Sequence, residues 1–243
     1  MEGKTRKVLG YDVNLLSFSE AVVFVREKID NFQGLHIVTI NPEMIELANY
    51  NVAFSQVLKK AELVIPDGAG IELALKLKGI VQERIPGIDF ARELIKSCCI
   101  KGNVISLIGA KQEIIELAVK KLQDEFKGLN ISYSRNGYFA ESEEDEIINN
   151  LVDSKPQLVL VALGAPKQEL FIDKCRKFLP NAVFIGVGGS FDVWAGVVER
   201  APKFFQIMRL EWLYRTIKQP ERFKRIYKTL PLFVIKAIID AKN

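Results

Sequence analysis

Short apolar runs alternate along the chain with segments in which apolar residues recur every three or four positions. The runs are typical of strands buried on both faces, and the spaced pattern is typical of helices packed against a sheet. This alternation predicts an α/β fold with a mostly parallel sheet that helices cover on both faces. We expect strands at 36–40, 62–65, 103–109, 158–164 and 182–189, and helices at 18–30, 43–60, 71–78, 88–99, 113–126, 143–151 and 168–178.

The pattern changes after Pro202. From there the chain keeps helical periodicity without another strand-like run, so we expect two or three helices, divided by Pro220 and Pro231. We therefore expect an α/β body at 1–199 and a basic helical C-terminal appendage at 200–243. The last apolar stretch has only about half of the roughly 20 residues that span a bilayer. It suits a helix that lies in a membrane interface or packs over a charged ligand.

Basic residues concentrate in the appendage. Residues 200–243 contain eleven Lys or Arg and three Asp or Glu, a net charge of +8, whereas the body carries −4 of the total of +4. A polyanion, an anionic lipid surface or a diphosphate substrate would each be attracted to such a segment. A solvated basic helix surface is the alternative.

The remaining composition narrows the classes of protein. The chain has 243 residues, 49% of them apolar, which is enough for a substantial core. Its three cysteines lack CxxC spacing and the N-terminus lacks a secretory apolar stretch, so a cytoplasmic protein without disulfides is expected. The one histidine, His36, lies inside an expected strand and is expected to be structural. Neither a metal, a cofactor nor a Ser-His-Asp or Cys-His hydrolase is indicated.

Polar residues and glycines follow each of the expected strands. Because ligands of open α/β sheets bind beyond the carboxyl ends of the strands, these residues are the first candidates for function. Asp67, in IPDGAG, directly follows the second strand. Its carboxylate could act as a general base if its surroundings raise its pKa. Equally, it could cap the next helix while Gly68 and Gly70 form the turn.

Three further side chains offer ligand contacts at the first strand and before the fourth helix. Thr39 and Asn41, in TINPEM, provide a hydroxyl and an amide suited to sugar hydroxyls, although Asn before Pro is also an ordinary helix start. Arg84, in QERIPGIDF, carries a fork of donors that could bind a phosphate. An exposed surface arginine is the alternative.

Two glycine-containing turns follow the last two strands. LGAPKQE opens a helix, so its backbone amides could hold a phosphate, and Gln168 could contact a base or sugar edge. GVGGSFD is a second turn where a ligand could approach the backbone closely. Neither matches GxGxxG, and GxxxxGK[ST] is absent, which disfavours dinucleotide oxidoreductases and P-loop NTPases. The candidate binding positions in these turns are Gly164, Pro166, Gln168, Gly188 and Asp192.

A set of motifs in a fixed order covers nearly the whole chain. They are TINPEM, IPDGAG, RIPGID, ALGAPKQE, GVGGSFD, GVVERAP and LEWLYR followed by QPERFKR. In this combination the chain resembles the WecG/TagA/CpsF glycosyltransferase family. The resemblance implies a Rossmann-like body that transfers a sugar from a UDP-sugar, with inversion and without a bound metal, to undecaprenyl-diphosphate-linked N-acetylglucosamine. In the teichoic-acid branch of the family the donor is UDP-ManNAc, and the transfer completes the linkage disaccharide of wall teichoic acid.

The resemblance also implies roles for individual residues. Asp67 corresponds to the base that deprotonates the acceptor hydroxyl, Thr39 and Asn41 to the sugar pocket, and Gln168 with the two glycine-containing turns to the donor region. In the tail motif, Arg215, Arg222 and Arg225 are implied to close over the site and stabilise the departing diphosphate, and Arg84 is expected to act likewise.

The implied partners are the UDP-sugar, the lipid-linked acceptor and the inner face of the cell membrane, which the tail would contact peripherally. No nucleic-acid partner is expected, and the tail's apolar residues leave open a homo-oligomer. Two other interpretations stay open: the same fold could transfer N-acetylmannosaminuronic acid, glucose or galactose, or the chain could be a non-catalytic adaptor that docks through its basic tail.

Overall fold

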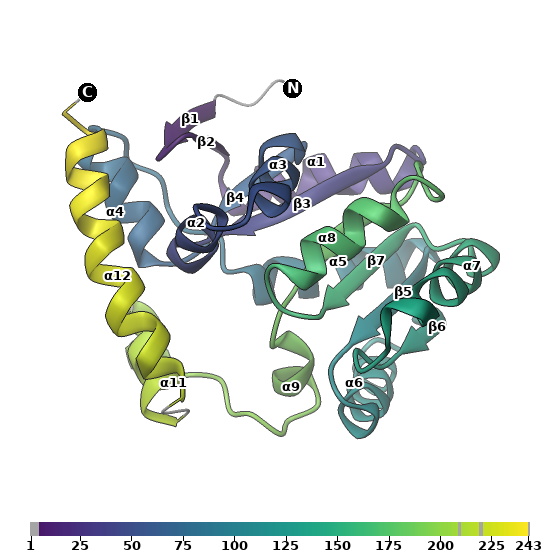
Figure 1. The fold of residues 1–243 in the computed structure, drawn as a ribbon. Helices are drawn as coiled ribbons and strands as arrows, with labels where there is room; N and C mark the ends of the chain where they lie inside the picture. The colour runs from purple at the N-terminus through teal and green to yellow at the C-terminus, as the bar shows by residue number, and fades with distance from the viewer. Residues whose placement is uncertain (1–4, 209, 219–220, 243) are drawn as a thin grey trace.

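The computed structural model describes residues 5–208, 210–218 and 221–242, without the side chains of residues 206–207, 212, 215–216, 218 and 221–228. Six of the described strands form one sheet in the order β4-β3-β8-β7-β5-β6, and every pair of neighbours is parallel. The predicted α/β class and all five predicted strands are confirmed (Figure 1). The strands are β3 (Leu35–Ile40), β4 (Leu63–Pro66), β5 (Val104–Gly109), β6 (Asn130–Arg135), β7 (Leu158–Ala162) and β8 (Val183–Gly186).

Three strands were not predicted. β6 lies at the edge of the sheet and alternates between exposed and half-buried residues, so it contains no apolar run. β1 (Thr5–Val8) and β2 (Tyr11–Asn14) form a separate antiparallel hairpin of only four residues each. Edge strands and short hairpins bury too little surface to leave the continuous apolar signal of central parallel strands.

Helices cover both faces of the sheet. Because side chains alternate along a strand, Ile37 of β3 faces α1, α5 and α6, whereas Val38 faces α2, α3 and α4. Beyond β8, the second face is covered by α7 and α8. The helices of the body are α1 (Phe18–Asp30), α2 (Pro42–Ala48), α3 (Val52–Lys60), α4 (Ala69–Leu77), α5 (Gly87–Lys101), α6 (Gln112–Glu125), α7 (Glu144–Ser154), α8 (Lys167–Cys175) and α9 (Ser190–Trp194), with a 3-10 turn at Glu141–Glu143.

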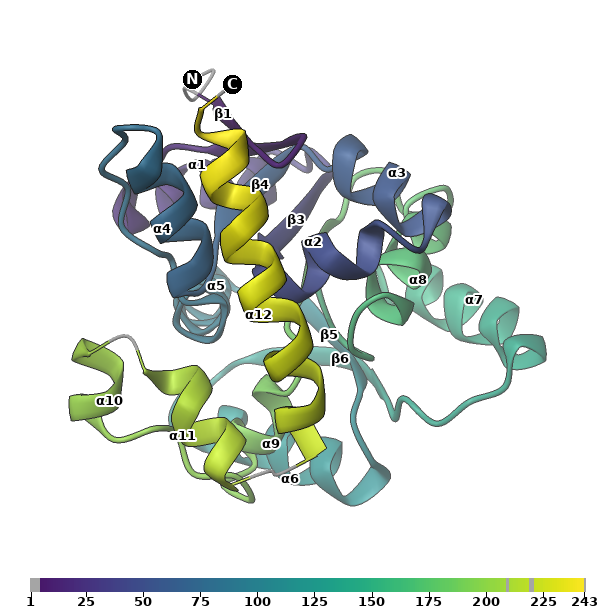
Figure 2. The ribbon, with the colours of Figure 1, turned by 60° about the vertical axis from the view of Figure 1, so that its left-hand side comes forward.

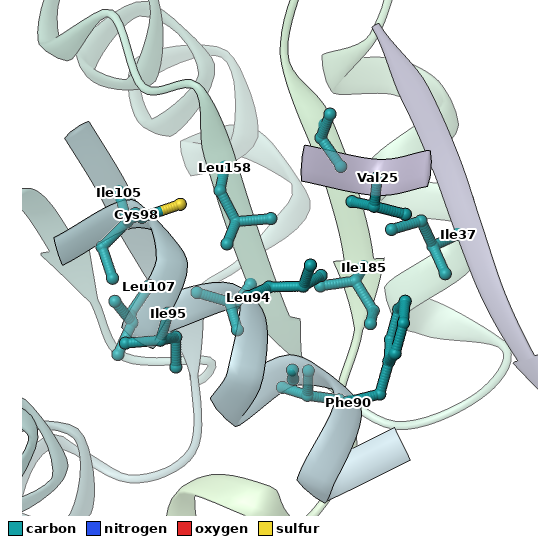
Figure 3. Packing of buried hydrophobic residues seen from close by; sticks show 14 of the residues in the cluster. Val25, Ile37, Phe90, Leu94, Ile95, Cys98, Ile105, Leu107, Leu158 and Ile185 are labelled. Atoms are coloured by element: carbon teal, nitrogen blue, oxygen red, sulfur yellow. The ribbon is translucent and has the colours of Figure 1, made fainter. Parts of the chain in front are cut away.

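The largest core cluster lies between the sheet and α1, α5 and α6. Figure 3 shows Phe90 and Leu94 of α5 lying against Leu158 and Ile185 of the sheet. All four side chains are fully buried. This packing fixes α5, and with it the loop that precedes α5, relative to the ends of the strands.

The helix predicted at 43–60 is wrong in one respect, since it is two helices. α2 ends at Ala48, and α3 starts after Asn51, whose side chain accepts a hydrogen bond from the backbone N–H of Phe54. An asparagine that caps a new helix competes with continuation of the previous one, and the apolar periodicity spans the break without showing it.

The C-terminal segment forms α10 (Lys203–Ile207), α11 (Glu211–Lys218) and α12 (Glu221–Asp240). Figure 2 shows α12 running along α4 and α2. The expected division at Pro231 is wrong: this exposed proline lies inside α12. The cost of a proline inside a helix, about 3 kcal/mol, is opposed here by burial of the next turns, where Phe233 and Ala237 are packed in the core cluster of α2, α3 and α4.

Polar contacts hold the same end of α12 to the body. Lys236 Nζ donates to Glu46 Oε2 of α2 at 2.7 Å, and Glu46 is buried. Asp240 pairs with Lys78 at 2.8 Å and accepts the backbone N–H of Leu9 from the turn between β1 and β2. Both ends of the described chain therefore meet beside α4. Among the described residues, no helix combines the length and the apolar character that crossing a membrane requires.

Candidate active site

A cavity of about 250 Å³ opens at the carboxyl ends of β3 and β4. Four residues expected to be functional from the sequence line it together: Thr39, Asn41, Asp67 and Arg84. They come from three separate segments of the chain, and the parallel sheet brings their strand ends to one edge. The cavity is also lined by Pro42, Glu43, Gly68, Ala69, Gly70, Pro86, Gly87, Ile88, Val187, Gly189 and Ser190 from the body, and by Glu211, Thr229 and Leu230 from α11 and α12.

Asp67 is held by backbone contacts on two sides. Its N–H donates to the carbonyl of Ile40 at 2.9 Å, which extends the β3–β4 pairing by one residue. Its Oδ2 accepts the N–H of Gly87 at 3.3 Å, at the start of α5. The helix-cap alternative is not observed, because α4 begins from Gly68 without a side-chain cap. The carboxylate of Asp67 thus lies in the cavity between the start of α5 and the end of β4.

Asn41 has the capping role and also lines the cavity. Its Oδ1 accepts the N–H of Met44 at 3.0 Å, so it starts α2 as the sequence alternative suggested. Its amide nitrogen forms no hydrogen bond with the described part of the chain and can donate to a ligand. Thr39 is the last but one residue of β3 and is half-buried. The cap therefore orients Asn41 without using up its donor.

Two glycines allow the motifs to approach closely. A Cβ on Gly87 would lie 3.0 Å from Thr39 Cγ2, and a Cβ on Gly70 would lie 2.4 Å from Pro42 Cγ. The same Cβ on Gly70 would lie 3.4 Å from the ring of Phe233 in α12. TINPEM, IPDGAG and RIPGID are therefore in contact: a side chain at residue 70 would clash with Pro42, and one at residue 87 would press on Thr39.

Arg84 takes part in a ladder of alternating charges. Its Nη1 donates to Glu211 Oε2 at 2.8 Å, and both side chains are largely buried, at 15% and 12% exposed. The other oxygen of Glu211 lies 4.0 Å from Nη2 of Arg200, which donates through both terminal nitrogens to Asp89. These bonds raise the pKa of Arg200, chiefly through Asp89. Arg84 is therefore not an exposed surface arginine. Ion pairs among Asp89, Arg200, Glu211 and Arg84 connect the motifs RIPGID, GVVERAP and LEWLYR.

The two glycine-containing turns are tied together by Gln168. This side chain is buried, and its Oε1 accepts the N–H of Gly164 and of Gly188, each at 3.2 Å. Its Nε2 donates to Glu169 Oε1 at 2.6 Å. Burial raises the pKa of Glu169 to about 7. Gln168 thus braces the turn whose neighbouring residues, Val187 and Gly189, line the cavity.

Some predicted positions lie away from the cavity wall. Pro166 precedes α8, and Asp192 lies half-buried in α9, where its carbonyl accepts the N–H groups of Val197 and Val198. Neither these two nor Gly164, Gln168 and Gly188 line the cavity in the described structure. Their expected ligand contacts stay predictions. The side chains of Arg215, Arg222 and Arg225 lie outside the described residues.

The described residues contain no cluster of three or more His, Cys, Asp or Glu side chains that could hold a metal ion. His36 is buried in β3, where burial, together with the charge of Arg176, lowers its pKa to about 3. It is therefore neutral at any ordinary pH, and it lies near the amino end of β3, away from the carboxyl ends where the cavity opens.

Comparison with known proteins identifies the family. Residues 6–243 match the model of the Glycosyl transferase WecG/TagA/CpsF family. The chain belongs to the WecG/TagA/CpsF family of glycosyl transferases. Two N-acetylglucosaminyldiphosphoundecaprenol N-acetyl-beta-D-mannosaminyltransferases are similar to it. The protein from Bacillus spizizenii is 37% identical over 229 residues, 91% of this chain and 88% of the relative. The protein from Bacillus subtilis is 35% identical over 231 residues, 95% of this chain and 88% of the relative.

Within this glycosyl transferase, the structure adds residues that the sequence reasoning did not single out. Glu211, Arg200 and Asp89 lie inside the motifs LEWLYR, GVVERAP and RIPGID, of which only Arg215 and Arg84 were selected. Gly87 was given no role, although its N–H donates to Asp67 and its lack of a side chain leaves room for Thr39. The motifs contain these residues, but the sequence alone does not show which of them contact one another in the fold.

Proposed function

We propose that this glycosyl transferase moves N-acetylmannosamine from UDP-ManNAc to undecaprenyl-diphosphate-linked N-acetylglucosamine, with inversion and without a metal, in the synthesis of the wall teichoic acid linkage unit. The observation that carries the proposal is the identity of 37% and 35%, over nearly the whole chain, to two transferases named for this acceptor and this sugar. The cavity supports it, because it gathers a carboxylate, a hydroxyl, an amide and a guanidinium.

In the proposed reaction, Asp67 takes the proton from the acceptor hydroxyl as that oxygen attacks the anomeric carbon of the donor sugar. The hydrogen bond from Gly87 and the backbone bond to Ile40 fix the direction of the carboxylate. The bond from the sugar to the diphosphate breaks on the opposite side, which inverts the anomeric configuration. Thr39 and the amide nitrogen of Asn41 donate to sugar hydroxyls.

The departing UDP gains negative charge as the bond breaks. A guanidinium placed at the developing charge in a water-poor site lowers the barrier by roughly 3–4 kcal/mol. We assign this role to Arg84, which is largely buried at the cavity wall. Arg215, Arg222 and Arg225 are proposed to add further positive charge from the tail. Gln168 is proposed to act through the turn at Gly188, on the donor side of the cavity.

A second part of the proposal concerns the membrane. Residues 200–243, with a net charge of +8, are proposed to act as a basic segment that holds the body at the inner face of the cell membrane. The outer side of α12 supports this, because four large apolar side chains are 40–57% exposed there. They are Leu232, Ile235, Ile238 and Ile239.

The reaction is tested by mass spectrometry of the product. The chain is incubated with a short-chain lipid diphosphate that carries N-acetylglucosamine, and with UDP-ManNAc, UDP-GlcNAc, UDP-glucose and UDP-galactose in separate reactions. We expect one added N-acetylhexosamine from UDP-ManNAc alone. Addition of another sugar would replace the donor, and no addition from any donor would favour the non-catalytic adaptor.

Membrane contact is tested by sedimentation with vesicles. Ile235→Asp should weaken binding to vesicles that contain anionic lipid, because it places a carboxylate on the outer side of α12. Glu125→Gln, on α6, is the matched control and should bind as the wild type does. Sedimentation of the chain without vesicles would instead indicate self-association through this apolar surface. Equal binding by Ile235→Asp and wild type would contradict the proposed contact.

A further inference from the structure

We propose that Glu211 is a positioning residue for the transfer, which holds the guanidinium of Arg84 in the direction needed for the donor diphosphate. This inference rests on the proposed function. It assigns a role to an acidic residue within a C-terminal segment that is mostly basic. Residues 200–243 contain only three acidic side chains, and of these Glu211 lines the cavity.

The geometry of the pair is that of a fixed support. Glu211 Oε2 accepts from Arg84 Nη1 at 2.8 Å, and the two side chains are only 12% and 15% exposed. Arg84 precedes α5 in a segment without helix or strand, so its backbone alone does not restrain so long a side chain. A buried carboxylate that holds one edge of the guanidinium removes the rotamer freedom which binding of a phosphate would otherwise have to restrict.

The opposite edge of the guanidinium remains available. Arg84 makes no other hydrogen bond or ion pair with the described part of the chain, so its remaining donors can serve a phosphate. A guanidinium can bind a carboxylate and a phosphate at the same time, because its five N–H groups lie in one plane and point in different directions. Glu211 therefore need not leave Arg84 when the donor binds.

Glu211 itself is held on its second side. Its Oε1 lies 4.0 Å from Arg200, and Arg200 is fixed by two hydrogen bonds to Asp89 in the first turn of α5. α5 also supplies the N–H of Gly87 that contacts Asp67. The start of α5 thus sets the positions of both the proposed base and, through Arg200 and Glu211, the guanidinium that faces the leaving group.

The charge balance of the cavity also favours a supporting role. The charged side chains described at its wall are Glu43, Asp67, Arg84 and Glu211. A carboxylate that lay there without a cation would repel a diphosphate, whereas Glu211 is already neutralised by Arg84 and lies near Arg200. Conversion of Glu211 to glutamine would remove the support and leave the positive charge of Arg84 uncompensated, so weaker UDP binding in that variant would reflect lost positioning and not lost electrostatic attraction.

A double-mutant cycle tests the inference on the full chain. Glu211→Gln, Arg84→Gln and the double variant are compared with the wild type in two readouts: calorimetric titration with UDP, and kcat and KM with UDP-ManNAc. We expect Glu211→Gln to lower kcat/KM by about 10- to 100-fold, the effect typical of a misplaced group, and to weaken UDP binding. In the Arg84→Gln background the same change should cause no further loss.

Controls separate positioning from folding. Glu125→Gln removes a carboxylate that pairs with Arg92 on the outside of the body, and it should leave both readouts unchanged. Glu211→Asp keeps the charge on a shorter side chain and should restore part of the lost kcat. If thermal unfolding shows that Glu211→Gln does not fold, the double-mutant cycle is measured with Glu211→Asp and Arg84→Lys instead.

Three results would overturn the inference. Glu211→Gln could leave UDP binding and kcat unchanged, it could cost as much in the Arg84→Gln background as in the wild type, or it could tighten UDP binding, which would make Glu211 a competitor of the phosphates for Arg84. Failure of the proposed function is distinct: a wild type that binds UDP but transfers no N-acetylmannosamine contradicts the donor or acceptor, while the binding cycle still decides the role of Glu211.

Discussion

On one side of the cavity, Thr39 lies at the end of β3, and Asn41 and Asp67 directly follow β3 and β4. On the other side, Glu211, Thr229 and Leu230 come from α11 and α12. The first side is fixed by sheet pairing and by a helix cap, contacts between segments close in the sheet. Among the described contacts, the second side is held by the ion pair of Glu211 with Arg84 and by the packing and the Lys236–Glu46 pair at the far end of α12.

We therefore expect the strand ends to carry the chemistry of the reaction, and α11 and α12 to close the cavity. Changes at the strand ends should alter the reaction and leave the fold intact, because the backbone contacts there remain. Changes along α12 should alter stability first, because Phe233 and Lys236 attach that helix to α2 and α4. Asp67→Asn, Phe233→Ala and Lys236→Met test this separation.

The largest effect is expected at the strand end. Asp67→Asn keeps an oxygen that can accept the N–H of Gly87 but cannot take a proton from the acceptor hydroxyl, so kcat should fall by about 10²- to 10⁴-fold. UDP affinity and the unfolding temperature should match the wild type. Asp124→Asn, an exposed carboxylate paired with Lys127, is the control. A kcat for Asp67→Asn within a factor of two of the wild type would remove Asp67 as the base.

The largest effect on stability is expected in α12. Phe233→Ala empties a fully buried site against α4 and should lower the free energy of unfolding by about 3–5 kcal/mol. Ile235→Ala, two residues on and 56% exposed, should change it by less than about 0.5 kcal/mol. Urea denaturation measures both. Equal values for the two variants would mean that α12 does not pack on the body in solution.

Glu169 should make stability depend on pH. Burial raises its pKa from 4.5 to about 7 in the folded chain, so the folded state keeps a proton that the unfolded state releases above about pH 4.5. The free energy of unfolding therefore falls as the pH rises through this window, by about 3 kcal/mol, and stays lower above it. Glu169→Gln should lose this part of the decline when urea denaturation at pH 5 and pH 8 is compared. An unchanged decline would contradict the buried carboxyl.

A smaller loss is expected when the ion pair of α12 is broken. Lys236→Met leaves the buried carboxylate of Glu46 without its cation and should cost about 2 kcal/mol, less than for a fully buried pair because Lys236 is 35% exposed. A second change, Glu46→Gln, should restore most of the loss. Lys242→Met, on an exposed side chain, is the control. Additive losses in the double variant would show that the two groups do not interact in solution.

The sequence predicted the central part of the fold because buried parallel strands are continuous apolar runs. β6 was missed since an edge strand alternates, and the break between α2 and α3 was missed since Asn51 interrupts the helix without interrupting the apolar period. At Pro231 a break was expected where the helix continues, because the tertiary packing of Phe233 and Ala237 outweighs a local helix breaker.

For the candidate site, a position at the end of a strand or directly after it was sufficient to select Thr39, Asn41 and Asp67. Nothing local predicts that Glu211 pairs with Arg84, because the two lie far apart in the sequence and either could have been an ordinary surface charge. The same holds for Gly87, whose role depends on what approaches it from β3. Pairing across the fold is the part that required the structure.

The central claim is that sugar transfer takes place in the cavity between β3, β4 and α11–α12. A crystal structure of Asp67→Asn with UDP-ManNAc and a short-chain acceptor tests it most directly. The account predicts the sugar ring between Thr39 and residue 67, the diphosphate within hydrogen-bonding distance of Arg84, and Glu211 still bound to Arg84. A donor bound elsewhere on the molecule, with no atom in contact with residue 67 or Arg84, would contradict it.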